Sequence, residues 1–377
     1  MFKSKLVSQV AVMAALCVMF AGVATAATLE VTNVSVVHEE TGQGGTRMIL
    51  EYDLEGSELA VATPTYVFIR YSADGGVTWN LVQRHLLNGD HDLVFSSGHK
   101  NVWWWGAGEM KVQNLDALKV EVRAIQMVRI LGGTYNRMTE AGGGFARVVV
   151  SDTPDVGDYY IAKYETTNAQ YADYLNEMSK DGRGYNMRMG SESRGGIKRE
   201  GEAGAYTYTM IAGKEDHPVT YTSWYDAMDF MGWCGMRLPT EEEWEKAYRG
   251  GLYLDGDDKK RKENPLPERK YPWGDEAGDA DGVFRCNLSG DKDGHASTAP
   301  VGSFGEYNSP YGVADMTGNA IEWTFNWYET PYHQDLDGYR MVRGGSWRSS
   351  AKSYSAITGA TQLPLNEDSL MGFRVAR

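Results

Sequence analysis

The chain has 377 residues, and its 37 Lys and Arg against 51 Asp and Glu give a formal net charge of −14 at pH 7. This acidic balance argues against nucleic acid as a partner, because phosphate backbones are bound mainly by clustered Lys and Arg side chains. Hydrophobic residues make up 42% of the chain and charged residues 23%, which is ordinary for a globular protein and argues against extensive disorder.

The first 26 residues are typical of a secretory signal peptide. Lys3 and Lys5 provide a positive region, and residues 6–22 are nearly all apolar. Ala24-Thr25-Ala26 then supplies the small residues that a signal peptidase needs. No other segment approaches the length of about 18 apolar residues that a membrane span requires. We therefore expect a cleaved signal peptide, a secreted or periplasmic protein, and no membrane span.

Two cysteines remain after the expected signal peptide, Cys234 and Cys286. In an oxidising compartment they could form a disulfide, or they could be two buried thiols, and the sequence leaves both possibilities open. The chain has no Cys-x-x-Cys motif. A zinc knuckle and a thioredoxin-like redox pair are therefore not expected.

Residues 27–125 show the alternating pattern of β-strands. The alternation runs over residues 29–36, 48–54, 66–71 and 118–123. Ala73-Asp74-Gly75-Gly76 is typical of a hairpin turn. Several short strands within about 100 residues predict an all-β sandwich domain. The segment 71–79 (YSADGGVTW) also resembles immunoglobulin- or fibronectin-like modules of secreted bacterial proteins, which mostly space or dock their neighbours.

After about Gln126 the pattern changes to short helices between Gly-rich, aromatic loops. A Ser or Thr followed three residues later by an acid predicts the start of a helix, and a Gly past the last periodic residue predicts its end. By this rule the predicted starts and ends are Ser223 with Asp226 and Gly235, and Thr240 with Glu243 and Gly250. Thr166-Thr167 is predicted to open a third helix. The charged run over residues 255–270 predicts a solvated loop insertion.

A series of short motifs follows in the same part of the chain. In order they are 127–134 (MVRILGGT), 161–168 (IAKYETTN), 217–219 (HPV), 237–245 (RLPTEEEWE), 271–274 (YPWG), 318–323 (GNAIEW), 343–347 (RGGSW) and 372–374 (GFR). Together they resemble the formylglycine-generating enzyme or sulfatase-modifying factor family. The resemblance covers residues 126–377, and it implies an α+β, C-type-lectin-like domain with little regular secondary structure. The all-β sandwich at 27–125 would precede it.

The resemblance implies a copper-dependent oxidase in active family members, which convert a sulfatase cysteine to formylglycine with dioxygen and Cu(I) held by two thiolates. It places the first thiolate position at Ser349 and the second within Ser353-Tyr354-Ser355, so neither position holds Cys. A neutral Ser hydroxyl is a hard, weak ligand, whereas Cu(I) is soft and prefers thiolate. We therefore expect no copper at this position and interpret the chain as a pseudoenzyme.

The resemblance also implies Ca²⁺ at two loops. In the first loop the implied ligands are the side chains of Asn287 and Asp293 and the carbonyls of Leu288 and His295. In the second they are the side chains of Asp315 and Glu322 and the carbonyls of Gly318 and Ala320. Ca²⁺ takes six to eight oxygen ligands of this kind. The alternative in each loop is an Asx-turn, in which the acid accepts hydrogen bonds from backbone amides.

We predict a non-catalytic binding or assembly protein outside the cytoplasm, with a protein, peptide or glycan as its ligand. The expected ligand groove is the one in which active relatives hold a peptide, and its expected residues are Trp323, Trp327, Ser346, Trp347 and Arg348. Arg343 and Arg374 are expected to pair with core carboxylates instead of binding substrate. One alternative is a formylglycine-generating oxidase acting on sulfatase cysteines. Another is a diversified lectin-like protein with its variable stretch over residues 348–370.

Overall fold

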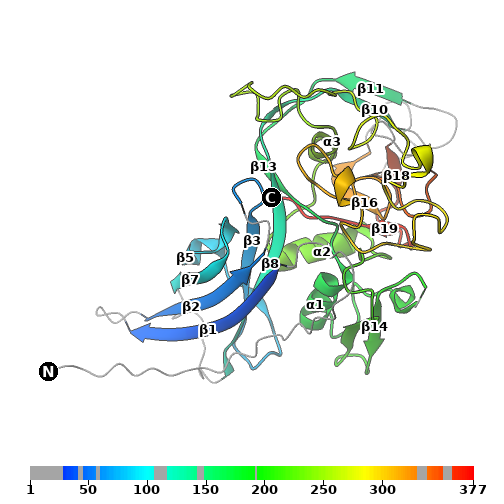
Figure 1. The fold of residues 1–377 in the computed structure, drawn as a ribbon. Helices are drawn as coiled ribbons and strands as arrows, with labels where there is room; N and C mark the ends of the chain where they lie inside the picture. Colours follow the sequence, from blue (N-terminus) through cyan, green and yellow to red (C-terminus); the bar gives the residue numbers. More distant parts are fainter. Residues whose placement is uncertain are drawn as a thin grey trace. The chain divides into compact units, whose positions relative to one another are not determined.

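The computed structural model describes residues 29–40, 46–56, 60–105, 117–141, 148–191, 193–328, 338–350 and 359–377. The chain forms two compact units. The first comprises Met1–Met127 with Trp233–Gly235, and the second comprises Val128–Gly232 with Met236–Arg377. Strand β8 (Lys119–Ile130) runs from the first unit into the second (Figure 1).

The first unit is built from two antiparallel sheets. One has the strand order β1 (Glu30–Glu40), β2 (Thr46–Glu55), β7 (Gly98–Trp105) and β5 (Leu87–Gly89). The other contains β3 (Thr65–Ser72), β4 (Asn80–Leu81), β6 (Asp92–Val94) and the first part of β8. β8 pairs with β3 over their full common length, from Thr65 opposite Gln126 to Ser72 opposite Lys119.

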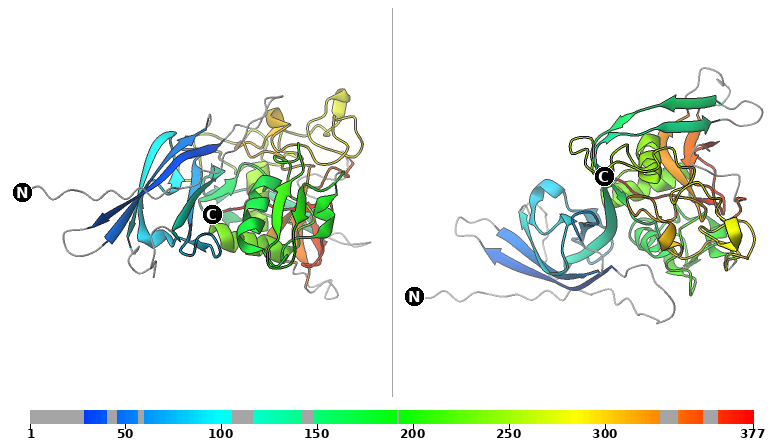
Figure 2. Two further views of the ribbon diagram at one scale, coloured as in Figure 1. Left: turned by 90° about the horizontal axis from the view of Figure 1, so that it is seen from below. Right: turned by 45° about the horizontal axis from the view of Figure 1, so that its top comes forward.

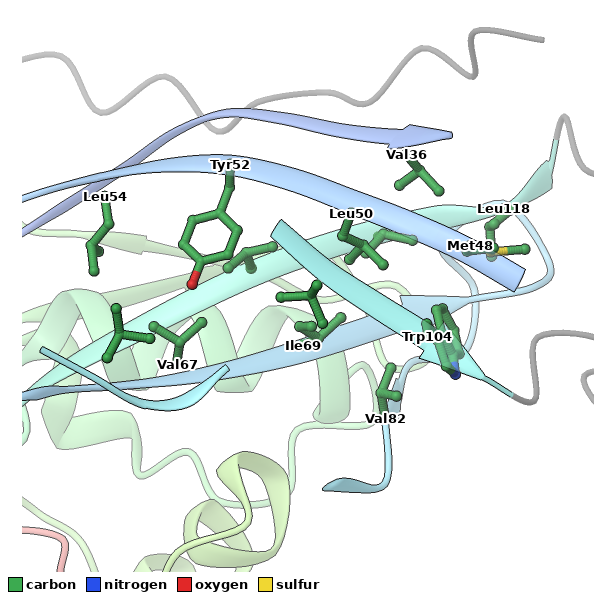
Figure 3. Packing of buried hydrophobic residues seen from close by; sticks show 14 residues of the cluster. Val36, Met48, Leu50, Tyr52, Leu54, Val67, Ile69, Val82, Trp104 and Leu118 are labelled. Atoms are coloured by element: carbon green, nitrogen blue, oxygen red, sulfur yellow. The ribbon is translucent and has the colours of Figure 1, made fainter. Parts of the chain in front are cut away.

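Side chains from both sheets form one hydrophobic cluster in the first unit. Leu50 and Tyr52 of β2 lie in the same layer as Val67 and Ile69 of β3 (Figure 3). The alternation that the sequence predicts over 48–54 buries every second side chain, because successive residues of a strand point to opposite faces. The strands lie where the sequence predicts them. The affiliation with fibronectin-like modules and the boundaries at residues 26 and 125 stay predictions.

The second unit combines short helices with small sheets, which is the α+β fold that the sequence predicts (Figure 2). Its helices are α1 (Asn168–Met178), most of α2 (Trp224–Cys234), and α3 (Glu241–Arg249). One sheet has the order β18 (Ala360–Gln362), β17 (Arg340–Arg343), β16 (Ile321–Trp327) and β19 (Met371–Gly372). The C-type-lectin-like character of this unit stays a prediction.

The remaining strands of the second unit are short. They are the pairs β9 (Gly133–Thr134) with β12 (Asp155–Val156), β10 (Arg137–Ala141) with β11 (Val148–Asp152) and β14 (Ile197–Glu200) with β15 (Thr207–Met210), and β13 (Tyr159–Ala162) beside β8. Of the helices in the described part of the chain, none combines the length and apolar character needed to cross a membrane.

The helix starts and ends predicted from the sequence are confirmed. At α3 the Thr240 hydroxyl accepts the Glu243 amide proton at 3.2 Å, and the Glu243 carboxylate accepts the Thr240 amide proton at 2.8 Å. The same helix ends at Gly250, whose φ of 85° suits glycine. At α2 the side chain of Asp226 accepts the amide proton of Ser223 at 2.8 Å.

We predict that Thr240→Ala lowers the free energy of unfolding of the second unit by about 1 kcal/mol, because one amide at the start of α3 loses its acceptor. Thr240→Ser keeps the hydroxyl and is the matched control. Urea denaturation followed by tryptophan fluorescence measures both. Equal midpoints for the Ala and Ser variants would show that the cap contributes nothing.

Candidate functional site

The first expected copper position lies in a closed turn. The Ser349 amide donates to the Ser346 carbonyl at 2.9 Å, and the Ser346 amide donates to Ser349 Oγ at 2.9 Å. Ser349 is 6% exposed, and its carbonyl accepts the Ser289 amide proton at 2.9 Å. The Ser349 hydroxyl therefore serves as an acceptor that holds the turn. The second expected position, 353–355, lies outside the described residues.

Cys234 and Cys286, whose pairing the sequence left open, are both buried and form no disulfide in the described part of the chain. Burial, with a smaller contribution from nearby acids of which Asp293 is the largest, raises the pKa of the Cys286 thiol. A thiol with a raised pKa stays protonated, whereas metal binding requires the thiolate. Cys286 is thus poorly suited to bind a soft metal ion as a thiolate.

The residues of the expected groove differ in their exposure. Trp323 and Ser346 are buried, and the indole of Trp323 donates to the Thr222 carbonyl at 2.9 Å. Trp347 is also buried, with its indole nitrogen donating to the Ser369 carbonyl at 3.1 Å. Trp327 and Arg348 are the exposed members. A ligand at this place would therefore meet Trp327 and Arg348 first, and the groove itself stays a prediction.

A carboxylate cluster is formed by the buried Glu165 and Glu322, the partly buried Asp315 and the buried Arg374. Arg374 donates two hydrogen bonds to the Glu322 carboxylate, at 2.6 and 2.7 Å. The indole of Trp244 donates a third at 2.8 Å. This arrangement confirms that Arg374 pairs with a core carboxylate, as Arg343 does with Glu245 at 2.9 Å.

The carboxylate cluster is short of positive charge. Three ionised carboxylates and one guanidinium would leave a net charge of −2, and all four groups act on one another. Burial, followed by the charges of Asp315 and Glu322, raises the pKa of Glu165 well above its usual value. Burial likewise raises the pKa of Asp315 to about 6. The cluster therefore favours bound protons or a nearby cation, since unpaired buried charge is costly.

The first expected calcium loop contains an acceptor without a donor. Asn287 Oδ1 is buried and has no hydrogen-bond partner among the described residues, although Asn287 Nδ2 donates to the Ser297 carbonyl at 2.8 Å. Asp293 accepts the amide protons of Leu288 at 2.7 Å and His295 at 3.0 Å, which is the contact pattern of the alternative Asx-turn. The turn and an oxygen ligand are compatible, because a carboxylate has about four acceptor sites.

The two expected calcium loops adjoin each other at Asn319. The Asn319 amide donates to the Asn287 carbonyl at 3.2 Å, and Asn319 Oδ1 accepts from Asn287 Nδ2 at 3.1 Å. A Cβ on Gly318 would lie 2.2 Å from the Asn287 carbonyl oxygen, so only glycine fits there. The described residues hold no group of three or more His, Cys, Asp or Glu arranged for a metal. Amide and carbonyl oxygens make up most of the expected ligands, so calcium stays a prediction.

Glu165 and Asn319 are site residues that the sequence did not predict. Glu165 Oε1 accepts the Ala320 amide proton at 2.9 Å, and Oε2 accepts from Asn319 Nδ2 at 2.6 Å. Both residues lie inside motifs on which the family resemblance was based, at 161–168 and 318–323. Their membership in those motifs was the available signal, but only the folded chain shows that they meet.

We predict that the Asp315 carboxyl makes stability depend on pH. Its pKa in the folded chain, about 6, lies above the ordinary value of 3.8. The native state therefore binds more protons than the unfolded state between these values, and the resulting stabilisation is lost as the pH rises through 6. Between about pH 5 and pH 7 the loss is on the order of 1 kcal/mol.

The measurement is the difference in unfolding free energy between the unmodified protein and Asp315→Asn in calcium-free buffer. As the pH rises, the unfolding free energy of the unmodified protein should fall relative to that of Asp315→Asn. Buried His217, whose pKa is lowered to about 3 chiefly by burial, has the opposite pH dependence. It is present in both proteins, so its contribution cancels. Two parallel pH curves would contradict the raised pKa of Asp315.

Comparison with known proteins places this site in a family. Residues 113–377 match the family model described as sulfatase-modifying factor enzyme 1-like domain. The formylglycine-generating enzyme of Streptomyces coelicolor is 34% identical over 187 residues, which cover 44% of this chain and 54% of that enzyme. The inactive C-alpha-formylglycine-generating enzyme 2 of Bos taurus is 35% identical over 175 residues, which cover 44% of this chain and 52% of that protein.

The chain spans about half the length of these two curated relatives. Among solved structures, PvdO from Pseudomonas aeruginosa is similar, with a TM-score of 0.45 and 21% sequence identity. That similarity covers 67% of this chain and 94% of PvdO.

Proposed function

The chain belongs to the sulfatase-modifying factor enzyme 1-like family, and on that premise we propose that it is a non-catalytic member that binds or assembles with a partner outside the cytoplasm. The observation that carries the proposal is the closed turn at Ser346 and Ser349. Where the family resemblance implies a thiolate, a hydroxyl accepts a backbone hydrogen bond. The residue present does not fit Cu(I), because a neutral hydroxyl is a hard and weak ligand.

The contacts that stabilise the second unit support the proposal of a folded scaffold without the reaction's metal ligands. The Arg374–Glu322 pair, the caps of α1 and α3 and the hydrophobic cluster around Trp244 are complete. The relative from Bos taurus that is 35% identical carries the word inactive in its name. A fold maintained without the metal ligands of the reaction fits a binding role.

Calcium is the second part of the proposal. Asn287 supports it in the first loop, because its buried carbonyl oxygen lacks a donor and a cation would satisfy it. In the second loop the negative charge of the carboxylate cluster supports a cation at Asp315. The bound ion would supply fixed positive charge and hold the two loops together, a structural role.

The expected signal peptide over residues 1–26 is the reason for placing the protein outside the cytoplasm, as a secreted or periplasmic protein. The partner would be a protein, a peptide or a glycan that meets the surface at Trp327 and Arg348. Both side chains are exposed, so they are available to a ligand in the folded chain.

We predict no oxidase activity. Protein supplied with Cu(I), dioxygen, a thiol reductant and a peptide carrying a sulfatase cysteine motif should consume no oxygen above the protein-free rate. The peptide mass should remain unchanged. The enzyme from Streptomyces coelicolor, under identical conditions, is the positive control. Formation of a formylglycine peptide over many turnovers would overturn the non-catalytic proposal.

We predict that Ca²⁺ raises the melting temperature and that a chelator lowers it, because a ligand bound only by the native state stabilises that state. Asp293→Asn should reduce the shift, since it removes a charge from the first loop. Asp258→Asn, an exposed acid in another loop, is the matched control and should keep the full shift. Identical melting curves with and without Ca²⁺ would rule out both calcium sites.

A further inference from the structure

Arg340, at the start of β17, is a buried arginine held between two indole rings. It lies opposite Trp327 in the pairing of β17 with β16, so the two side chains share one face of the sheet. Its guanidinium carbon lies 3.2 Å from the ring centroid of Trp327 and 3.6 Å from that of Trp224. The two rings are stacked with their centroids 6.4 Å apart, a spacing that one planar group fills. A guanidinium stacked in this way has only its edges, which carry the N–H groups, for hydrogen bonds.

One edge of the Arg340 guanidinium has no acceptor. Nη1 donates to the Phe325 carbonyl at 2.6 Å. Nε is buried and has no hydrogen-bond partner, and Nη2 forms no hydrogen bond with a described residue. Because Nε and Nη2 carry parallel N–H groups, this edge is a fork that a carboxylate fills with two hydrogen bonds. An unfilled buried donor is costly, so the edge favours an acceptor.

The positive charge of Arg340 also lacks a counter-ion. The side chain is 5% exposed, and no described Asp or Glu forms an ion pair with it. Burial lowers the pKa of Arg340 to about 10, so the group stays charged at neutral pH. Arg343, at the other end of β17, instead donates to the Glu245 carboxylate at 2.9 Å. The indole rings offset part of the charge of Arg340, but a buried cation without a carboxylate still favours an anion.

Exposed aromatic rings surround this arginine. Phe325, whose carbonyl accepts from Arg340, is 48% exposed, and Trp327 is 45% exposed. Tyr225 is 46% exposed, and its ring centroid lies 5.4 Å from that of Trp224. A ligand that reaches the guanidinium would therefore meet large apolar surfaces beside it.

The neighbouring polar side chain on β18 is already engaged. Gln362 lies opposite Arg340 in the pairing of β17 with β18, and its Oε1 accepts from Asn366 Nδ2 at 2.9 Å. The next residue, Leu363, is 51% exposed. The surroundings of Arg340 thus suit an apolar group better than one rich in hydroxyls.

We propose that Arg340 and the rings around it bind the C-terminal carboxylate of a peptide whose last side chain is apolar. The carboxylate would accept from Nε and Nη2, and the apolar side chain would cover Phe325. Trp327 is about half exposed, so its ring can turn outward and admit the carboxylate, a side-chain movement that is common on binding. This inference rests on the proposed binding function and names its ligand class.

Two other anions fit the observations less well. A uronic acid also carries a carboxylate, but the hydroxyl groups around it need polar partners that the rings do not offer. A phosphate monoester carries nearly two negative charges at neutral pH, and one guanidinium offsets only one of them.

The test is calorimetric titration of the full chain with an N-acetylated tripeptide that ends in phenylalanine, and with the same tripeptide as its C-terminal amide. The free acid should bind at least about tenfold more tightly, because the amide lacks the charge and one acceptor. Arg340→Lys keeps the charge but loses the fork, and should weaken binding of the free acid about tenfold. Arg199→Lys is the matched control and should leave the affinity unchanged, since Arg199 also lies over two rings, at 4.9 and 4.2 Å from their centroids.

Phe325→Ala removes an exposed ring without touching the Arg340 stack, and should weaken binding about fivefold. Melting curves of each variant confirm that it folds. If Arg340→Lys does not fold, the comparison of acid with amide, in the unmodified chain and in Phe325→Ala, still decides.

The inference would be overturned by absence of binding, by equal affinities for acid and amide, or by equal losses in Arg340→Lys and Arg199→Lys. Tighter binding of a glucuronic acid oligomer or of inorganic phosphate would assign Arg340 to another anion and overturn it as well. None of these readouts involves copper or dioxygen, so failure here leaves the proposed non-catalytic function separately testable.

Discussion

The second unit is organised around one buried guanidinium. Arg374 forms a paired contact with the fully buried Glu322, at 2.6 and 2.7 Å. It also donates to the carbonyls of Ala162 and Lys163 at 3.1 Å and of Ala314 at 2.9 Å. One side chain therefore joins three parts of the chain that are far apart in the sequence, at residues 162–163, 314–322 and 374. Removing one partner of a buried ion pair typically costs about 3–5 kcal/mol, because the other charge remains buried.

The buried Glu322 of this pair lies on the strand that also carries two exposed aromatic side chains. Glu322 is near the buried start of β16, while Phe325 and Trp327 are exposed toward its end. Anchoring the start of the strand therefore fixes the direction in which its aromatic side chains emerge. The same strand lies beside β17, which begins at Arg340, so these two aromatic side chains and the Glu322 carboxylate share one sheet.

Local signals in the sequence were sufficient to predict the helix caps, the strands of the first unit and the pairing of Arg374 with an acid. Each depends on residues close together in the chain or on the cost of burying an arginine alone. Long-range contacts were not foreseeable in the same way. The charged run 255–270 was expected to be solvated, yet Arg269 is buried and donates to the Asn264 side chain at 2.6 Å. Likewise, no local pattern indicates that Glu165 meets Asn319, because that contact spans more than 150 residues.

The functional proposal depends on Ser349, which stands at the position where the family resemblance implies a thiolate. The most direct measurement is the Cu(I) affinity of the purified chain, determined by anaerobic competition with a strong Cu(I) chelator. We predict that the chelator takes all of the copper. Retention of one Cu(I) per chain against the chelator would contradict a non-catalytic role.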